Sequence, residues 1–333
     1  MKKWSLDVCY SVSSTIVSPV KNLCLPSHNE EYKMSKLMPL SEAVSKFIKD
    51  GNTVYAAGFT HLIPFAAGHE IIRQRKRNLT LARATPDLIY DMLVAGGCAR
   101  KIIFSYMGNP GVGSLRIVRA AIEKGEIEWE EYSHFGMISR LQAGAAGLPF
   151  MPMNQTGATD LEKVNPNIRR VTDPYGGKEV IVLPAFNPDV GIVHVQRADA
   201  QGNAHLWGIV GEQKEVAFAS RCVILTAEEI VEEEIIRSDP NRTIIPGFIV
   251  KAVCHVPHAC HPSYAQGYYD RDNAFYLEWD KISQSMEQVN AWLDEWVFGV
   301  KDHAEYWNRL GAEVHERLKI KERFSTPVNY GEY

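Results

Sequence analysis

The sequence predicts an α/β fold with an open, mainly parallel sheet. Short apolar runs of strand length alternate with stretches whose apolar residues recur at helical spacing, and this alternation is typical of successive βαβ units. The chain has 333 residues, of which 45% are hydrophobic and 23% charged. It is therefore long enough for one large α/β domain or two closely packed lobes.

The first half of the chain repeats the alternation regularly. A first helix is expected from Leu40, with Ser41 as its N-cap and Gly51 as its stop, because apolar residues recur at helical spacing between them. The elements expected next are strand 53–57, helix 64–74, strand 79–82, helix 87–95, strand 101–106 and helix 114–124.

The second half is less regular. Two β-branched runs, 180–183 and 190–195, are separated by prolines, and a third run, 204–207, follows a turn. We expect these runs to be antiparallel hairpin strands within the mainly parallel sheet. Further strands are expected at 222–226 and 249–256, and a long amphipathic helix is expected through Trp292 and Trp296.

The domain organisation is expected to have three parts. Met34 opens the segment MSKLMPLSEAV, which reads like a natural bacterial start, so we expect residues 1–33 to be an N-terminal extension that is disordered or results from a mis-called start. One domain is expected over 34–323, followed by a C-terminal tail over 324–333.

Composition excludes several classes of partner. A formal charge of −4 argues against nucleic-acid binding, which needs a concentrated excess of lysine and arginine. No segment approaches the roughly 20 apolar residues that cross a bilayer. From these two observations we expect neither a nucleic-acid nor a membrane partner. The six sparse cysteines fit no disulfide framework, so we expect a cytoplasmic protein.

A cysteine and histidine cluster at 254–261 offers sulfur and nitrogen ligands of the kind that zinc prefers. Structural zinc sites normally use two separated ligand pairs, whereas these candidates crowd into one short segment. Strand-like alternation would also direct neighbouring side chains to opposite faces. We therefore expect no metal site.

Three glycine-containing loops follow expected strands and are the candidate binding elements. Glycine there lets a backbone N–H group approach a ligand oxygen closely, and loops after successive parallel strands meet at one edge of the sheet. The candidate residues are Gly58, Phe59 and Thr60 in the first loop, Asn109 and Gly111 in the second, and Gly157 and Thr159 in the third.

No local motif supplies a nucleophile. The sequence contains no G-x-S-x-G, Walker A, H-E-x-x-H or G-x-G-x-x-G pattern. The acidic runs 126–131 and 228–234 are interpreted as solvated faces. His134 follows the first acidic run and joins the candidate substrate-binding residues, although a lone histidine is more often structural.

Several long segments together resemble the family I CoA-transferases, and most closely the α subunit of glutaconate CoA-transferase. They cover the chain from Met34 to the last helices. The segments are MSKLMPLSEAVSKFIKDG (34–51), AGFT (57–60), GAAGLPFMP (144–152), AEEIVEEEIIRSDPNRTIIPG (227–247), HPSYAQGYYDRDN (261–273) and EWVFGVKDHAEYWNRLGA (295–312).

This resemblance implies a fold of the CoA-transferase/ribose-isomerase type and an α₂β₂ assembly with a homologous β subunit. It implies that a β-subunit glutamate attacks the acyl-CoA thioester, and that a glutamyl-CoA thioester then passes CoA to a glutaconate-like dicarboxylate or 3-oxo acid. Coenzyme A is then a substrate, and no cofactor is expected. No catalytic residue is expected in this chain, which would supply substrate-binding loops.

Two alternatives remain open. The resemblance places His134 where related transferases carry glutamine, and ring-opening hydrolases of steroid degradation carry a functional glutamate nearby. With His134 as a base, the chain would be a subunit of a CoA-ester or cyclic-diketone hydrolase. The other alternative is a non-catalytic acyl-CoA sensor. The lack of an appended DNA-binding element argues against this alternative.

Overall fold

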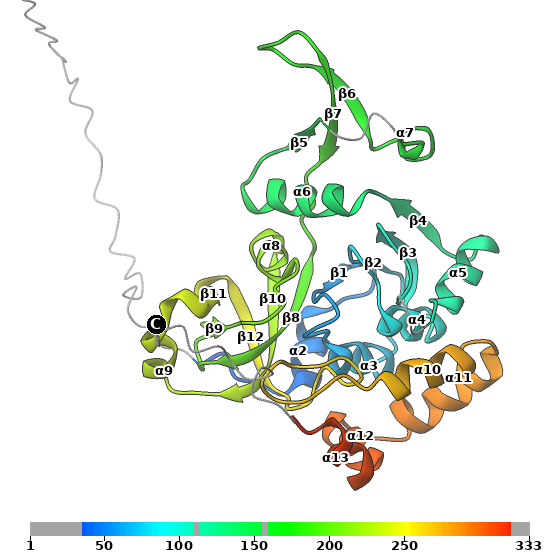
Figure 1. The fold of residues 1–333 in the computed structure, drawn as a ribbon, viewed down its shortest axis with the longest axis vertical. Helices are drawn as coiled ribbons and strands as arrows, with labels where there is room; N and C mark the ends of the chain where they lie inside the picture. Colours follow the sequence, from blue (N-terminus) through cyan, green and yellow to red (C-terminus); the bar gives the residue numbers. More distant parts are fainter. Residues whose placement is uncertain (1–34, 110–112, 155–158, 321–333) are drawn as a thin grey trace, which may run out of the picture. The chain divides into compact units, whose positions relative to one another are not determined.

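The computed structural model describes residues 35–109, 113–154 and 159–320 (Figure 1). The expected extension over 1–33, the tail over 324–333 and the two candidate residues Gly111 and Gly157 lie outside these ranges. The domain boundaries therefore stay predictions. No helix within the described ranges is long and apolar enough to cross a membrane.

The main sheet is mixed and has nine strands within the described residues. Its parallel part runs in the order β4-β3-β2-β1-β8-β10-β12. The parallel strands are β1 (Thr53–Ala56), β2 (Leu79–Ala82), β3 (Ala99–Phe104), β4 (Glu128–Glu131), β8 (Val190–Ala198), β10 (Cys222–Ile230) and β12 (Val250–His255). Two short antiparallel strands, β9 (Ala204–His205) and β11 (Thr243–Ile245), branch from the far end of β8.

A separate antiparallel sheet has the order β5-β7-β6 and lies beyond helix α6 in Figure 1. Its strands are β5 (Phe150–Met153), β6 (Arg169–Thr172) and β7 (Glu179–Pro184). The expected hairpin of 180–183 with 190–195 is therefore wrong, because β7 belongs to this small sheet whereas β8 pairs parallel with β1 and β10. The expected antiparallel pairing of the next run is confirmed, since β9 folds back on β8.

Helices cover the sheet and fill the C-terminal third. They are α2 (Leu40–Phe47), α3 (Phe65–Arg73), α4 (Leu88–Ala95), α5 (Arg116–Glu123), α6 (His134–Ala145), α7 (Leu161–Val164), α8 (Gln213–Ala219), α9 (Glu233–Ser238), α10 (Asn273–Ile282), α11 (Met286–Leu293), α12 (His303–Leu310) and α13 (Ala312–Leu318). Helix α11 continues into a π-helical turn, Asp294–Phe298. The expected N-cap at Ser41 is wrong, because Pro39 is the N-cap and Ser41 lies inside α2 as its second residue.

Two hydrophobic cores lie on the two faces of the main sheet. Strand β1 contributes Val54 and Ala56 to one core and Tyr55 to the other, as the two-residue period of a strand requires. Because both faces of the sheet are buried, ligands can reach it only at the loops that follow the strand ends.

Candidate functional site

A pocket of about 360 Å³ lies where β1, β2, β3 and β4 end. Each of these parallel strands contributes the loop or helix start that follows it, and one residue comes from just before α10. The lining residues are Phe59, Thr60, Arg83, Thr85, Asp87, Tyr106, Gly108, Asn109, His134 and Arg271. The pocket therefore occupies the carboxyl edge of the sheet, where open α/β folds bind ligands.

The loop after β1 depends on glycine at its first position. Gly58 has φ +128°, and a Cβ there would lie 2.8 Å from the carbonyl oxygens of both His61 and Leu62. The same loop turns tightly at Thr60, which has φ 55° and accepts a 2.8 Å hydrogen bond from Ser263 on its carbonyl oxygen. Gly58 thus allows the close backbone approach that presents Phe59 and Thr60 to the pocket.

The loop after β2 supplies the buried charges of the pocket. Arg83 is 1% exposed and donates from Nη2 to the carbonyl oxygen of Gly58. Asp87 caps α4 by accepting from Leu88 N at 2.7 Å, and its carboxyl also accepts from the Tyr276 hydroxyl at 3.0 Å. Burial raises the pKa of Asp87 above its ordinary value, and Arg83 acts in the opposite direction.

His134 is the first residue of α6 and forms one edge of the pocket. Ser133 caps this helix by accepting from Gly136 N at 3.0 Å, and this contact fixes where His134 lies. Its Nε2 lies 2.9 Å from Thr85 Oγ1, and its ring packs edge-on against Phe59 with centroids 5.8 Å apart. Partial burial lowers the pKa of His134, so the neutral ring is favoured at pH 7.

A second cavity of about 250 Å³ shares Phe59 and His134 with the pocket. Its buried acid is Glu212, whose Oε1 accepts from the Tyr55 hydroxyl at 3.3 Å. Burial raises the pKa of Glu212, so this carboxyl is disposed toward its neutral form.

Comparisons with known proteins assign the family. The model of the coenzyme A transferase family matches residues 37–255. The chain is the α subunit of a family I CoA-transferase. It is 50% identical over 280 residues to the α subunit of 3-oxoadipate CoA-transferase from Pseudomonas knackmussii, covering 83% of this chain and 99% of that one.

Glutaconate CoA-transferase is a further relative. Its α subunit from Acidaminococcus fermentans is 36% identical over 305 residues, covering 86% of this chain and 95% of that one. The crystal structure of that transferase superposes with a TM-score of 0.83 at 33% identity, covering 90% of this chain and 100% of that one. The expected family and fold are therefore confirmed, and identity is higher to the 3-oxoadipate than to the glutaconate relative.

Some of the substrate-binding residues predicted for a CoA-transferase subunit lie together in one pocket. Phe59, Thr60, Asn109 and His134 line one pocket, and the carbonyl of Gly58 lies behind it as the acceptor of Arg83. Thr159 does not line this pocket, because it follows β5 of the small antiparallel sheet instead of a strand of the main sheet.

Sequence reasoning missed the charged lining of this CoA-transferase pocket. Arg83 follows the apolar strand β2 directly and Asp87 precedes α4, and both were usable signals because the strand and the helix were predicted. Arg271 carried no such signal, since its position depends on the packing of a distant segment against α4. Its guanidinium lies 4.0 Å above the ring of Tyr276.

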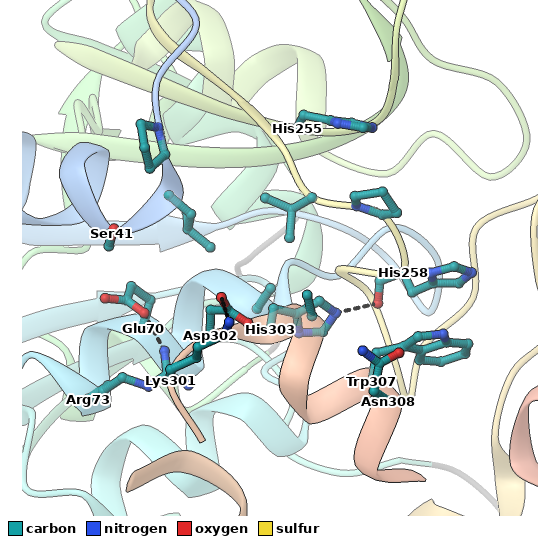
Figure 2. A pocket seen from close by; sticks show the side chains of 16 residues that line it. Ser41, Glu70, Arg73, His255, His258, Lys301, Asp302, His303, Trp307 and Asn308 are labelled. Carbon is teal, nitrogen blue, oxygen red and sulfur yellow. Dashed lines mark hydrogen bonds and ion pairs between the residues drawn. The ribbon is translucent and has the colours of Figure 1, made fainter. Parts of the chain in front are cut away.

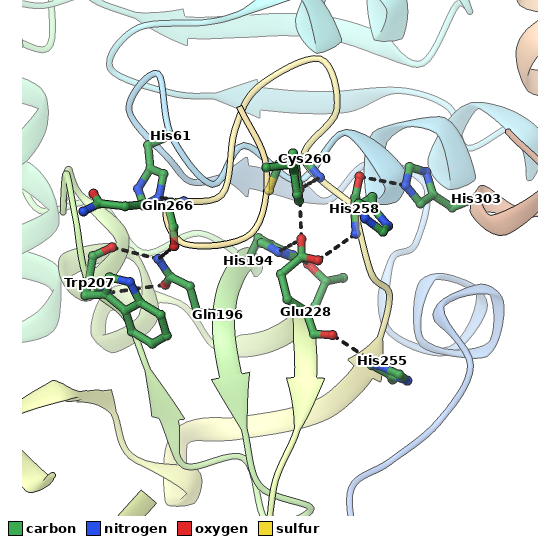
Figure 3. A network of polar contacts seen from close by, with 12 residues as sticks. His61, His194, Gln196, Trp207, Glu228, His255, His258, Cys260, Gln266 and His303 are labelled. Atoms are coloured by element: carbon green, nitrogen blue, oxygen red, sulfur yellow. Dashed lines mark hydrogen bonds and ion pairs between the residues drawn. The ribbon is translucent and has the colours of Figure 1, made fainter. Parts of the chain in front are cut away.

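The cysteine and histidine cluster of this transferase is divided among different contacts (Figure 3). His255 Nε2 lies 3.1 Å from the Glu228 carbonyl oxygen, whereas His261 contacts Tyr306 and Asp272. Glu228 was expected on a solvated face but is 5% exposed within β10. It accepts hydrogen bonds from His194, Tyr269 and the backbone N–H of His258, at 2.7–2.8 Å.

The same network brings three potential ligand atoms together. Atoms of His194, Glu228 and Cys260 lie within 4.8 Å of one another. His194 and Glu228, however, already hydrogen-bond to each other at 2.8 Å, and burial raises the pKa of the Cys260 thiol well above its ordinary value. Because both oxygens of Glu228 also accept hydrogen bonds within the protein, this geometry favours a structural polar network.

A larger cavity of about 640 Å³ lies between α2, α3, the end of β12 and α12 (Figure 2). His255, His258, Lys301, Asp302 and His303 line it, and His303 Nε2 donates to the His258 carbonyl oxygen at 2.9 Å. Of the predicted substrate-binding residues that the structure describes, none lines this cavity.

Proposed function

We propose that this chain pairs with a homologous β subunit to form an α₂β₂ CoA-transferase for short dicarboxylic acids, of the 3-oxoadipate or glutaconate type. The supporting observation is the pocket at the carboxyl edge of β1–β4, which is large enough for a small acyl group and is lined by the buried Arg83 and the half-buried Arg271. The names of the two relatives, 3-oxoadipate and glutaconate CoA-transferase, agree with this chemistry.

The covalent steps in this proposal belong to the partner. A glutamate carboxylate of the β subunit attacks the acyl-CoA carbonyl carbon, and the CoA thiolate leaves as an acyl-glutamyl anhydride forms. The thiolate then attacks the glutamyl carbonyl, which releases the acid and leaves a glutamyl-CoA thioester. The acceptor acid repeats the two steps in reverse and departs as the new CoA ester.

Residues of this chain hold and shield the acyl group during these steps. The loop at Gly58 brings the backbone of Phe59 and Thr60 close to the bound acyl group. The neutral ring of His134, next to Thr85, can form a hydrogen bond with that group. Enclosure between two subunits would keep water from the anhydride and the thioester, both of which water would hydrolyse.

The test is to purify this chain alone and together with its β subunit. Succinyl-CoA or acetyl-CoA is supplied with 3-oxoadipate, glutaconate or acetoacetate, and the CoA esters are followed by mass spectrometry. The proposal expects new CoA esters only with the pair and only when an acceptor acid is present. Release of free CoA without an acceptor would indicate a hydrolase, and tight acyl-CoA binding without chemistry would indicate a sensor.

A further inference from the structure

Buried hydrogen-bond donors without partners converge on the pocket at the carboxyl edge. Within the described part of the chain, no acceptor meets Nε or Nη1 of Arg83, Nδ2 of Asn109, or Nε of Arg271. All three side chains line the same cavity, and Arg83 and Asn109 are 1% and 6% exposed. A buried donor that lacks an acceptor destabilises a fold, so this concentration of such donors points to a missing acceptor.

The charges of the pocket describe that acceptor. Two guanidinium groups, Arg83 and Arg271, line the cavity with a single carboxyl group, Asp87, which interacts electrostatically with both. The Oδ1 atom of Asp87 already accepts from both Leu88 N and the Tyr276 hydroxyl. Glu212 lines the adjoining cavity and not this pocket, and its Oε1 accepts from the Tyr55 hydroxyl. One positive charge is therefore left unbalanced.

A singly charged anion with two acceptor oxygens satisfies both requirements. A carboxylate offers about four lone-pair sites, enough for N–H groups of Arg83, Asn109 and Arg271 at once. The 3′-phosphate of CoA would instead bring about two negative charges, one more than the pocket leaves unbalanced.

We propose that Arg83, with Asn109 and Arg271, binds the second carboxylate of a dicarboxylic substrate, the one remote from the carbonyl that reacts. This inference rests on the proposed function and deepens it, because it assigns the selection of diacids over monoacids to this chain. Arg83 is then a specificity-determining residue held in place by the carbonyl oxygen of Gly58.

The experiment compares acceptor acids that differ only in this group, using the complex of both subunits. The pairs are 3-oxoadipate with 3-oxohexanoate, and glutarate with pentanoate. The wild-type complex should prefer each diacid by about 10²-fold or more in kcat/KM, because a site built for a polar group rejects an analogue that lacks it. Arg83→Met should bring this ratio close to one by lowering kcat/KM for the diacid alone.

Further variants separate the proposal from a merely structural role. Asn109→Ala and Arg271→Gln should each lower the diacid preference by about 10-fold, and they carry the test if Arg83→Met fails to fold. Arg100, on the exposed side of β3, provides the control Arg100→Met, which should leave both acids unaffected. Equal losses for diacid and monoacid, or a raised KM for the CoA donor whatever its acyl group, would overturn the inference.

A binding measurement separates this inference from the proposed function. Titration calorimetry of the complex with glutarate should show binding that Arg83→Met weakens by about 10²-fold or more, whether or not CoA is transferred. Glutarate binding without transfer would leave the carboxylate site standing while the transferase fails. Transfer to diacids with no effect of Arg83, Asn109 or Arg271 would refute the site alone.

Discussion

Arg83 donates a hydrogen bond from Nη2 to the carbonyl oxygen of Gly58, and this contact joins the loops that follow β1 and β2. The glycine at 58 permits the backbone approach, and the arginine, which lines the pocket and has no acceptor for Nε and Nη1 among the described residues, holds it there. The positive φ of Gly58 in the loop after β1 and the buried guanidinium of Arg83 in the loop after β2 are therefore coupled through one hydrogen bond.

Replacing this glycine should damage the pocket more than an ordinary substitution. Gly58→Ala places a Cβ 2.8 Å from two carbonyl oxygens at φ +128°, so we expect a loss of about 1–3 kcal/mol in stability and at least a 10-fold loss of CoA transfer. Gly125→Ala is the matched control, since Gly125 also has positive φ but no atom within 4 Å of the place where a Cβ would lie. Thermal melting and turnover of both variants test this, and equal effects would contradict it.

At the contact between Gly68 of α3 and Ile89 of α4, one destabilising substitution should partly offset another. A Cβ on Gly68 would lie 2.2 Å from Ile89 Cγ1, so Gly68→Ala should destabilise the protein by about 1–3 kcal/mol through overpacking. Ile89→Ala alone should cost about 2–5 kcal/mol as a cavity. In the double variant the removed isoleucine atoms make room for the new methyl group. Urea unfolding should therefore give a total loss smaller than the sum, and strict additivity would argue against this contact.

The buried glutamate of Figure 3 should be sensitive to a change of one atom. Both oxygens of Glu228 accept hydrogen bonds, so the amide group of Glu228→Gln must face a donor. We expect a loss of at least about 1–3 kcal/mol in unfolding free energy. The neighbouring Glu229→Gln disturbs a partly exposed pair with Arg197 and a contact with the Tyr268 hydroxyl, and it should cost about 0–1 kcal/mol. Similar melting temperatures for the two variants would contradict a structural network.

Stability should fall in mild acid because of His61. Its Nδ1 faces the Ile209 carbonyl oxygen, which can only accept, and its Nε2 accepts from Gln266 N at 2.9 Å. Protonation of Nε2 would break the second contact, and burial lowers the pKa of His61 to about 4. The unfolded chain, with an ordinary histidine pKa near 6.5, thus binds a proton first as pH falls.

The sign and the pH range follow from this difference in pKa. The stabilisation from neutral His61 is complete above about pH 6.5 and is lost progressively toward pH 4, by up to about 1.4 kcal/mol per pH unit. Unfolding of the wild type and of His61→Gln, measured between pH 7.5 and 4.5, should show a shallower slope for the variant. Parallel slopes would exclude His61 as a source.

The parallel strands and the sheet edge that carries the site could be predicted from sequence because apolar runs and glycine loops are local signals. The small sheet could not, since β7 and β8 have the same β-branched composition and only long-range pairing separates them. Arg83 was missed because a charged residue after a strand is usually solvated, and its contacts, the Gly58 carbonyl oxygen and the Tyr90 ring, lie on other elements. Glu228 was missed for the same reason, because its partners lie on β8 and on the segment after β12.

The most direct measurement is intact-mass spectrometry of both subunits after the complex is mixed with an acyl-CoA in the absence of acceptor acid. We predict that CoA becomes covalently attached to the β subunit while the mass of this chain stays unchanged, because this chain supplies the pocket and its partner supplies the nucleophile. A CoA adduct on this chain, at Asp87, Glu212 or any other carboxyl group, would contradict that division of roles.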